Sequence, residues 1–309
     1  MVTFLRKRAL TSLLPLVVVL LGVFFLARLT GDPASLYLPE NATEAQKETF
    51  REVNGLDLPV WQQLVDYLQG ILRLDFGTSL STGESAAAMA LRAFPATLQL
   101  AITTMLIAVV LAVVIGSWAA YRPNSLADRF ASFLSMTAAS VPDFWLAIMG
   151  VWVFAVMLGV LPTSGVDAGL LSWVLPIATL LLRPVGVLTQ VVRGAMVAAL
   201  SAPYVRLARS KGADSRRVVA HHALRNAAAP ALTVAGDLAV GLVNGAVVVE
   251  SIFGWPGIGK LMIDSITGRD FAILQAAVLL TAVTIFLLNI AIDICYALLD
   301  ARVRDKAMV

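Results

Sequence analysis

The chain has 309 residues, of which 59% are hydrophobic and only 14% are charged. Soluble globular domains carry about 25% charged residues, so this composition excludes a soluble globule and predicts a membrane protein. The net charge of +3 could suit a nucleic-acid partner. However, the basic residues lie at the ends of apolar stretches rather than in one patch, and this placement argues against nucleic acid.

Disulfide and metal chemistry are also excluded. The single cysteine, Cys295, cannot form an intramolecular disulfide. The two histidines, His221 and His222, are adjacent in the sequence and point about 100° apart on a helix, so they cannot share an ion. Because no Ser/His/Asp set is present either, we expect neither a metal site nor catalytic residues in this chain.

The hydropathy pattern predicts an all-α protein, in which residues 1–309 form one domain with six transmembrane helices. The first apolar stretch follows Arg6, Lys7 and Arg8, and it is long enough to cross a membrane and longer than the core of a signal peptide. We expect the spans at about residues 9–29, 94–121, 130–161, 171–193, 230–250 and 271–299. Between them lie an extended loop of residues 30–93, a polar segment of residues 201–229 and a second loop of residues 251–270.

The distribution of Lys and Arg predicts the orientation in the membrane. If the N-terminus is cytosolic, the inner segments hold fifteen of the 23 basic residues and the outer segments hold six. Basic residues accumulate on the cytoplasmic side of membrane proteins. We therefore expect both termini and the polar segment in the cytoplasm, and the two loops outside.

The polar segment, residues 201–229, predicts two short helices joined at a hinge. Gly212 can adopt the left-handed conformation that ends a helix, and Asp214 is a suitable N-cap for the next one. In that second helix Arg217, His221 and Arg225 recur at every fourth residue and would share a face. Such a basic elbow is suited to docking on another protein. Two simpler interpretations are that it only orients the chain in the membrane, or that it lies on anionic lipid.

The second loop contains a sequence that superficially fits a phosphate-binding loop. Gly254, Gly259 and Lys260 match G-x-x-x-x-G-K, but Leu261 stands where a hydroxyl should hold Mg²⁺, and Pro256 constrains the loop. We therefore expect no ATP-binding site in this chain.

Three charged residues lie well within predicted spans: Asp143, Arg183 and Asp237. An unpaired charge there costs at least ~2.5–3.5 kcal/mol, so such residues usually face a cavity or one another. Arg183 and Asp237 each lie roughly 12 residues, or about 18 Å, from the outer ends of their helices. We hypothesise that they pair at the wall of a pathway, where either could also contact cargo.

Several segments together resemble the permease subunits of ABC importers, in the dipeptide/oligopeptide branch. The polar segment is similar to the family's coupling loop, although Arg206-Leu207-Ala208 replaces its Glu-Ala-Ala. The matches there are Tyr204, Ala208, Arg209, Lys211, Gly212, His222, Ala223, Leu224, Arg225, Asn226 and Pro230. The second loop resembles the family's E-x-x-F-x-W-P-G-x-G at Glu250, Phe253, Trp255, Pro256, Gly257 and Gly259. Residues 54–59, 74–79 and 142–145 also fit the branch.

The resemblance implies a transport subunit of an ATP-driven importer for di- or oligopeptides in a bacterial or archaeal plasma membrane. It implies that ATP and Mg²⁺ bind to partner subunits, and that this chain carries no cofactor and is not an enzyme. The implied partners are a second homologous permease, two ATP-binding subunits, an external solute-binding protein, the lipid bilayer and a peptide substrate. The implied coupling residues in the polar segment are Tyr204, Arg206, Ala208, Arg209, Lys211, Gly212, Arg217, His222, Arg225 and Asn226. The second loop would border the external gate.

Other functions remain open from the sequence. Within the same branch the cargo could be nickel, glutathione, an opine or haem. From other classes, the chain could be a secondary carrier that ignores ATP, or an interaction scaffold without transport. A carrier should work when purified alone, and a scaffold should tolerate the loss of Arg183 and Asp237.

Overall fold

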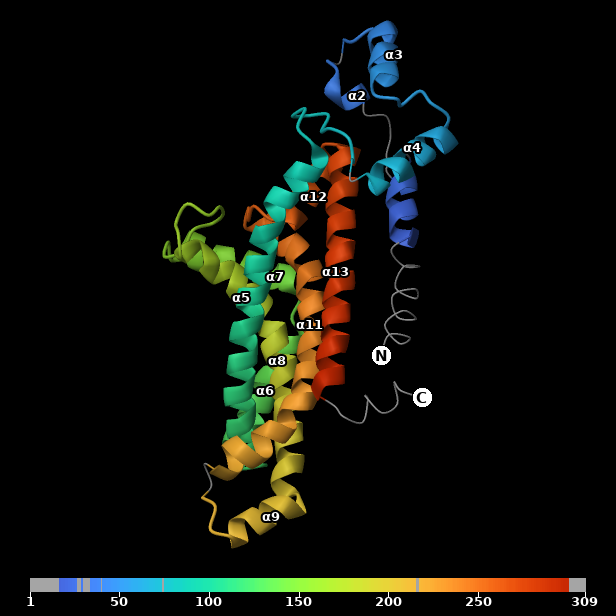
Figure 1. Cartoon of the computed structure of the whole chain (residues 1–309). Helices are drawn as coiled ribbons and strands as arrows, with labels where there is room; N and C mark the ends of the chain where they lie inside the picture. Colours follow the sequence, from blue (N-terminus) through green and yellow to red (C-terminus); the bar gives the residue numbers. More distant parts are fainter. Residues whose placement is uncertain are drawn as a thin grey trace, which may run out of the picture. The chain divides into compact units, whose positions relative to one another are not determined.

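The computed structural model describes residues 17–26, 29, 34–39, 41–73, 75–214 and 217–299. These residues are almost entirely helical, and the β-structure among them is one isolated bridge between Thr78 and Ser85 (Figure 1). The chain divides into two compact units. The first unit contains residues 98–255 with the end of the last helix, and the second unit contains the residues before 98 together with residues 256–287.

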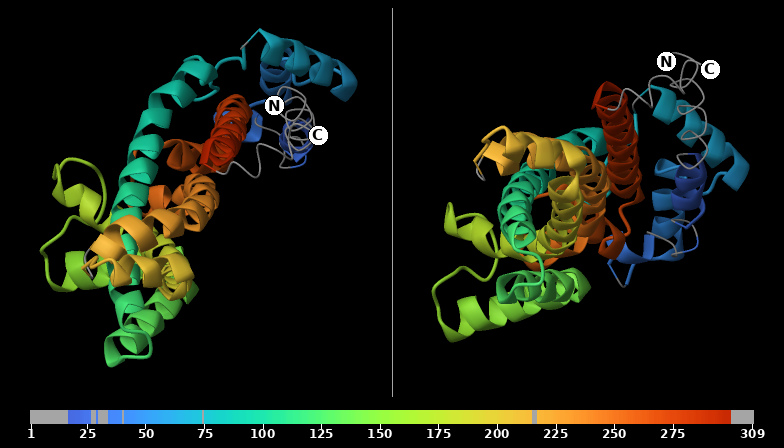
Figure 2. Two further views of the ribbon diagram at one scale, coloured as in Figure 1. Left: turned by 60° about the horizontal axis from the view of Figure 1, so that its bottom comes forward. Right: turned by 90° about the horizontal axis from the view of Figure 1, so that it is seen from below.

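The first unit is built around long apolar helices. Its elements are most of α5 (Ala86–Tyr121), α6 (Leu126–Ser140), α7 (Asp143–Gly150), the π-helix η1 (Val151–Met157), α8 (Leu171–Ser201), α9 (Pro203–Ser210), the π-helix η2 (Val218–Ala223), α11 (Leu224–Ile252) and the end of α13 (Phe271–Leu299). Helix α8 packs along α11 on one side and α6 on another (Figures 1 and 2). This unit therefore holds the polar segment between two tightly packed helices.

The second unit holds the extended loop and its supports. Its elements are the apolar helix Val17–Leu26, α2 (Ala34–Tyr37), α3 (Glu44–Val53), α4 (Val60–Leu72), the start of α5, α12 (Ile258–Thr267) and the first part of α13. A small core of Ala86, Ala90, Ile273 and Ala276 joins α5 to α13. Residues that the sequence places in a loop thus form three helices of their own.

The membrane spans agree only partly with the six expected. Four helices, α5, α8, α11 and α13, are long and apolar enough to cross a bilayer. The expected third span, residues 130–161, is not continuous, because α6 and α7 meet at an angle of 96°. Val141 at this break is extended, with φ −83° and ψ 130°, since a residue before proline is excluded from the helical region. Of the first span only Val17–Leu26 is described, and residues 9–16 lie outside the described residues.

The boundaries of three other spans are also different. Helix α5 begins at Ala86 rather than near residue 94, and α8 continues to Ser201 rather than ending near residue 193. The fifth span does not begin at Pro230, because η2 and α11 form one continuous helix through that proline. Each helix continues past its apolar stretch because its next turns still pack in the protein: Ala199, Ala223 and Ala227 belong to one buried cluster.

Glycines allow the helices of the first unit to approach closely. A Cβ added to Gly186 in α8 would lie 2.4 Å from the carbonyl oxygen of Ser135 in α6. One added to Gly236 in α11 would lie 2.7 Å from Ile292 in α13. Small residues at such crossings are typical of helices that pack in membranes, as expected for residues 236–245.

Three buried or half-buried hydrogen bonds fasten the second unit together. The Ser79 hydroxyl donates to the Asp270 carboxylate at 2.6 Å, and the Ile258 N–H donates to the Thr97 hydroxyl at 2.8 Å. The Tyr37 hydroxyl donates to the Gly268 carbonyl at 2.6 Å. Burial, with the nearby Asp270 carboxylate, raises the pKa of the Tyr37 phenol, so the phenol keeps the proton that this bond needs. These bonds hold the extended loop against residues 256–270.

Candidate coupling surface and external surfaces

The short helix α9 leaves the end of α8 at a sharp turn. Ala202 is extended, with φ −69° and ψ 151°, and Pro203 opens α9 at the position where a missing N–H does least harm. Val205 is fully buried and anchors the helix, whereas Tyr204 and Leu207 are exposed. The helix is therefore held by one apolar side chain and presents the rest of its surface outward.

The end of α9 has the geometry that the sequence predicts. Gly212 is left-handed, with φ +86°. Its N–H donates to the Arg209 carbonyl at 3.0 Å, and the N–H of Ala213 donates to the Ala208 carbonyl at 3.1 Å. These two bonds are the Schellman arrangement that closes a helix at glycine. The carboxylate of Asp214 accepts the Arg217 N–H at 3.1 Å, which confirms the predicted cap.

From residue 217 the chain is not a second separate helix. Helix η2 continues directly into α11, so the later part of the polar segment belongs to a long helix. A π-helix has more residues per turn than an α-helix, so the spacing of four residues no longer aligns Arg217 with position 221. Arg217, Arg225 and Asn226 are exposed, and the side chains of His221 and His222 lie outside the described residues.

Unpaired positive charge is concentrated at this elbow. Arg206, Arg209, Lys211 and Arg217 are all exposed. None of these four forms an ion pair within the described ranges of the chain. Ala208 is half-buried behind them. An exposed cationic surface without internal partners is able to meet acidic groups of another protein.

One basic residue of this region has a different role that the sequence did not reveal. Arg193 forms a two-contact ion pair with Asp128, in which its Nη2 lies 2.7 Å from Oδ2. The Asp128 side chain is only 2% exposed and also accepts the Asn124 N–H at 2.8 Å. The pair fastens the start of α6 to α8. A Ser-x-x-Asp start at Ser125 marks Asp128 as a helix-start residue, but no local pattern points to its partner 65 residues later.

The charges inside the predicted spans do not pair as hypothesised. Arg183 and Asp237 are exposed on this chain, and no ion pair joins them among the described residues. One oxygen of Asp143 is buried without a hydrogen bond, and the other would lie 3.6 Å from a Cβ at Gly245. Arg183 and Asp237 lie at similar depths along their helices, but depth does not determine the direction in which a side chain points around its helix.

The second loop is more buried than expected for a surface that meets another protein. Glu250, Phe253 and Trp255 are at most 3% exposed. The Trp255 ring meets Trp173 edge to face at 4.6 Å, and the Phe253 carbonyl accepts the Gly165 N–H at 2.8 Å. Packing in the first unit covers these three side chains, so they hold the loop in place, and the role of the loop at the external gate stays a prediction.

The part of this loop in the second unit is mostly buried as well. Gly257 and Gly259 are buried, and Pro256 is exposed. Lys260, which superficially fits a phosphate-binding lysine, pairs with Asp264 one turn along α12. These residues form the N-terminal end of helix α12.

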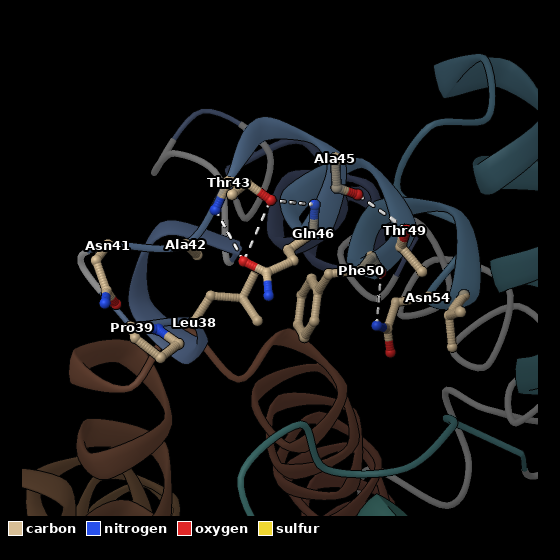
Figure 3. A pocket seen from close by; sticks show the side chains of 11 residues that line it. Leu38, Pro39, Asn41, Ala42, Thr43, Ala45, Gln46, Thr49, Phe50 and Asn54 are labelled. Atoms are coloured by element: carbon tan, nitrogen blue, oxygen red, sulfur yellow. Dashed lines mark hydrogen bonds between the residues drawn. The ribbon is translucent and has the colours of Figure 1, made fainter.

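The extended loop carries an open pocket between α2 and α3. Its volume is about 790 Å³, and Figure 3 shows its lining side chains. Thr43 and Gln46 form a reciprocal capping box at its edge. Among the described residues, the lining contains no charged side chain, although α3 itself carries Glu44, Lys47 and Arg51. The pocket thus offers apolar contact and uncharged hydrogen-bonding groups.

Long apolar helices joined to an exposed polar elbow define an integral membrane protein of the transport-subunit class. Two solved structures share the fold. The inward-facing MetNI methionine ABC transporter matches with a TM-score of 0.57 and 17% identity, over 69% of this chain and 96% of that chain. An amino acid ABC transporter crystallised with histidines matches with a TM-score of 0.52 and 16% identity, over 70% of this chain and 94% of that chain.

The sequence comparisons establish the family. Residues 112–305 match the binding-protein-dependent transport system inner membrane component, and residues 1–101 match the N-terminal part of such membrane components. The chain belongs to this family and is a permease subunit of an ABC importer of the peptide/glutathione type. It is 37% identical to the glutathione transport system permease GsiC of Salmonella typhimurium, over 99% of this chain and all of that protein. GsiC of Escherichia coli K12 is 36% identical over the same extent.

Proposed function

We propose that this permease subunit forms half of the pathway of an importer for di- or oligopeptides, and that it receives movement through the elbow of residues 203–212. The observation that carries the proposal is the set of exposed, unpaired basic side chains on α9 and its closing turn. An ATP-binding subunit with an acidic or hydrogen-bonding groove would suit this surface. ATP and Mg²⁺ would bind in that subunit.

The packing around α9 suggests how a push would reach the membrane. Val205 ties α9 into the protein, Ala202 connects it rigidly to α8, and η2 connects the other side to α11. Because α8 and α11 pack along each other, displacement of α9 would tilt both helices together. Rocking of a packed bundle against a second, homologous permease is a known form of alternating access.

Charge reversal at the elbow tests this role. Changing Arg209, Lys211 and Arg217 to Glu should leave membrane insertion and the amount of permease unchanged, because all three side chains are exposed and unpaired. The assembled complex should then hydrolyse ATP without cargo uptake, or lose both activities. Normal uptake driven by ATP would contradict the role. Uptake that continues without any ATP-binding subunit would instead identify a secondary carrier.

The cargo is the finer part of the proposal. The relatives at 37% and 36% identity are described as glutathione permeases, and glutathione is itself a modified tripeptide, so it is the second candidate. The opposite charges of Arg183 and Asp143, both within predicted spans, would suit a cargo that carries both an amine and a carboxylate. Asp237 is a further candidate for the pathway wall. Neither a nickel ion nor haem carries both an amine and a carboxylate, so neither cargo would use these two opposite charges in this way.

Uptake by the complete transporter distinguishes the cargoes. Proteoliposomes with both permeases, the ATP-binding subunits and the binding protein should take up labelled dipeptide, and excess glutathione should compete if it shares the pathway. Arg183→Gln should raise the apparent KM for a charged peptide more than Arg183→Lys does. Equal effects of the two variants would show that the charge of Arg183 does not contact cargo.

The orientation and the external partner complete the proposal. Both termini and α9 would lie in the cytoplasm, as the basic residues predict. The extended loop would then face the solute-binding protein, and the pocket formed by α3 and the residues before it is the part of the loop best suited to receive a protruding side chain. Phe50→Ala in that pocket should weaken stimulation by the binding protein without changing basal ATP hydrolysis.

A further inference from the structure

Helix α4 carries an exposed apolar stripe that none of the described residues of the second unit covers. Trp61, Val65, Leu68 and Leu72 are 68%, 43%, 40% and 86% exposed. Their spacing of four, three and four residues places them on one face of the helix. Asp66 and Gln69 are exposed on the other face. None of the residues of α4 is buried, so the helix is amphipathic and lies at the surface of its unit.

An aromatic contact places α4 beside the apolar helix Val17–Leu26. The rings of Tyr67 and Phe24 stack at 5.3 Å with an interplanar angle of 26°, and Phe24 is fully buried. Figure 1 shows α4 at the end of that apolar helix. Val18 and Leu26 of the same helix are exposed. Helix α4 therefore lies beside a helix that has exposed apolar side chains of its own.

The position of Phe24 gives the depth of this contact. The uncharged run of the first span ends at Ala27, before Arg28. Phe24 is three residues from that end, or about 5 Å along the helix axis. Amphipathic helices at a membrane surface bury their apolar face about 5–10 Å into the boundary between headgroups and acyl chains. Tyr67, and α4 with it, thus lies at the depth of that boundary.

We propose that α4 lies in the membrane interface on the side where the first span ends, with Trp61, Val65, Leu68 and Leu72 inserted among the acyl chains. Trp61 is well suited to this position because its ring is apolar and its N–H is polar. The polar face, which includes Gln62, Asp66 and Gln69, has no Lys or Arg. Insertion would therefore depend on apolar contact and would not require anionic lipid. The extended loop would be fastened to the bilayer at this helix.

The turn after α4 supports a fixed position for the helix. The Asp75 N–H donates to the Gly70 carbonyl at 2.9 Å, so the chain folds back at once towards α5. A Cβ at Gly70 would lie 2.4 Å from the Asp75 carbonyl oxygen, so only glycine permits this return. Gln63 also donates to the Leu58 carbonyl at 2.7 Å. Both ends of α4 are thus held by the backbone around it.

Spin labels on the two faces test the proposal in the assembled transporter. In a Cys295→Ser background, single cysteines Leu68→Cys and Gln69→Cys would be labelled in complexes held in phosphatidylcholine nanodiscs. The label at position 68 should collide more with oxygen, which concentrates in the bilayer, than with a water-soluble nickel chelate. The order should be reversed at the neighbouring position 69. A label at Leu72→Cys should repeat the result for position 68.

Several outcomes would overturn the proposal. If the position 68 label meets the chelate as freely as the position 69 label, the stripe faces water. If it is immobile and inaccessible to both reagents, a protein partner covers the stripe instead. A Val18→Cys label that samples the chelate would show that the first span is not in the bilayer, and α4 would lose its depth reference. Detachment of α4 in neutral nanodiscs but not in phosphatidylglycerol nanodiscs would contradict apolar insertion. None of these readouts depends on transport.

Discussion

At Gly212 the backbone needs a conformation that residues with a Cβ adopt at a cost. Its φ is +86°, and no atom would lie within 4 Å of an added Cβ, so strain rather than crowding decides the effect of a substitution. Gly212→Ala should destabilise the end of α9 by about 1–2 kcal/mol. Hydrogen exchange of residues 208–213 should become faster. Gly212→Asn should be milder, because asparagine tolerates the left-handed region. Equal protection in all three proteins would contradict this reading.

The Asp128–Arg193 pair makes a second prediction at the scale of single residues. Asp128→Asn leaves the Arg193 charge largely buried without its partner, which should cost about 3 kcal/mol. The combined Asp128→Leu and Arg193→Met variant should be less destabilised than the sum of the effects of Asp128→Leu alone and Arg193→Met alone. Thermal denaturation of the purified complex would measure the stability of the unchanged protein, the two single variants and the double variant. Additive effects would mean that the two side chains do not stabilise the fold as a pair.

Single residues could be predicted from the sequence where the interaction is local. Gly212 and Asp214 act within a few residues of themselves, so a turn pattern was sufficient. The partner of Arg193 is 65 residues away, and only the crossing of α6 and α8 brings the two together. The same limit explains the error over Arg183 and Asp237. The sequence gives the position along each helix, but packing decides the rotation of each helix about its axis.

At the scale of elements, the crossing of α6 and α8 depends on the absence of a side chain. In Gly186→Ala the new Cβ would lie 2.4 Å from the Ser135 carbonyl oxygen, so one helix must move. Overpacking of this kind typically costs about 1–3 kcal/mol. Gly194→Ala in the same helix is a matched control, because no atom lies within 4 Å of its Cβ. The melting temperature of the complex should fall for the first variant only. A similar fall for both would show that the crossing does not set the cost, because alanine is a better helix former than glycine at either position.

The extended loop offers a second element to test. Ser79→Ala removes a buried hydrogen bond to the Asp270 carboxylate, which should cost about 1.5–3 kcal/mol because the acceptor is charged. Residues 30–93 should become more sensitive to limited proteolysis from the outside. Ser140→Ala is the control, since its exposed hydroxyl bonds only to its own helix, at Met136. Unchanged cleavage in Ser79→Ala would show that this bond does not hold the loop.

Hydropathy located most of the long helices but not their ends or breaks. Four of the six expected spans overlap helices that meet the membrane criteria. The 96° break at Pro142 was missed because apolar residues continue through it, and the pattern alone does not distinguish a straight span from a bent one. The helical start of the fifth span at η2 was missed for the opposite reason. Polar residues and Pro230 suggested a short helix separate from the span, whereas packing of Ala223 and Ala227 keeps the chain helical from η2 into α11.

At the scale of the whole molecule, the sequence comparisons establish the family and the two solved structures share the fold. The relatives match over 99% of the chain, and the two transporter structures match over about two-thirds of it. The motifs of residues 201–230 and 250–259 are sufficient to indicate the family. They do not indicate the cargo, because these motifs lie outside the charged positions proposed for the pathway. In the proposed function, the elbow is the part of the chain that receives movement from the ATP-binding subunits.

Accessibility of the elbow is therefore the most direct test. In a Cys295→Ser background, Ser210→Cys on α9 and Glu48→Cys on α3 would be treated with a membrane-impermeant maleimide. In intact cells only position 48 should react. In opened membranes, position 210 should react when the permeases are present without the ATP-binding subunits. It should become protected when those subunits assemble. Reaction of position 210 from outside intact cells, or equal reaction with and without those subunits, would contradict the proposed coupling.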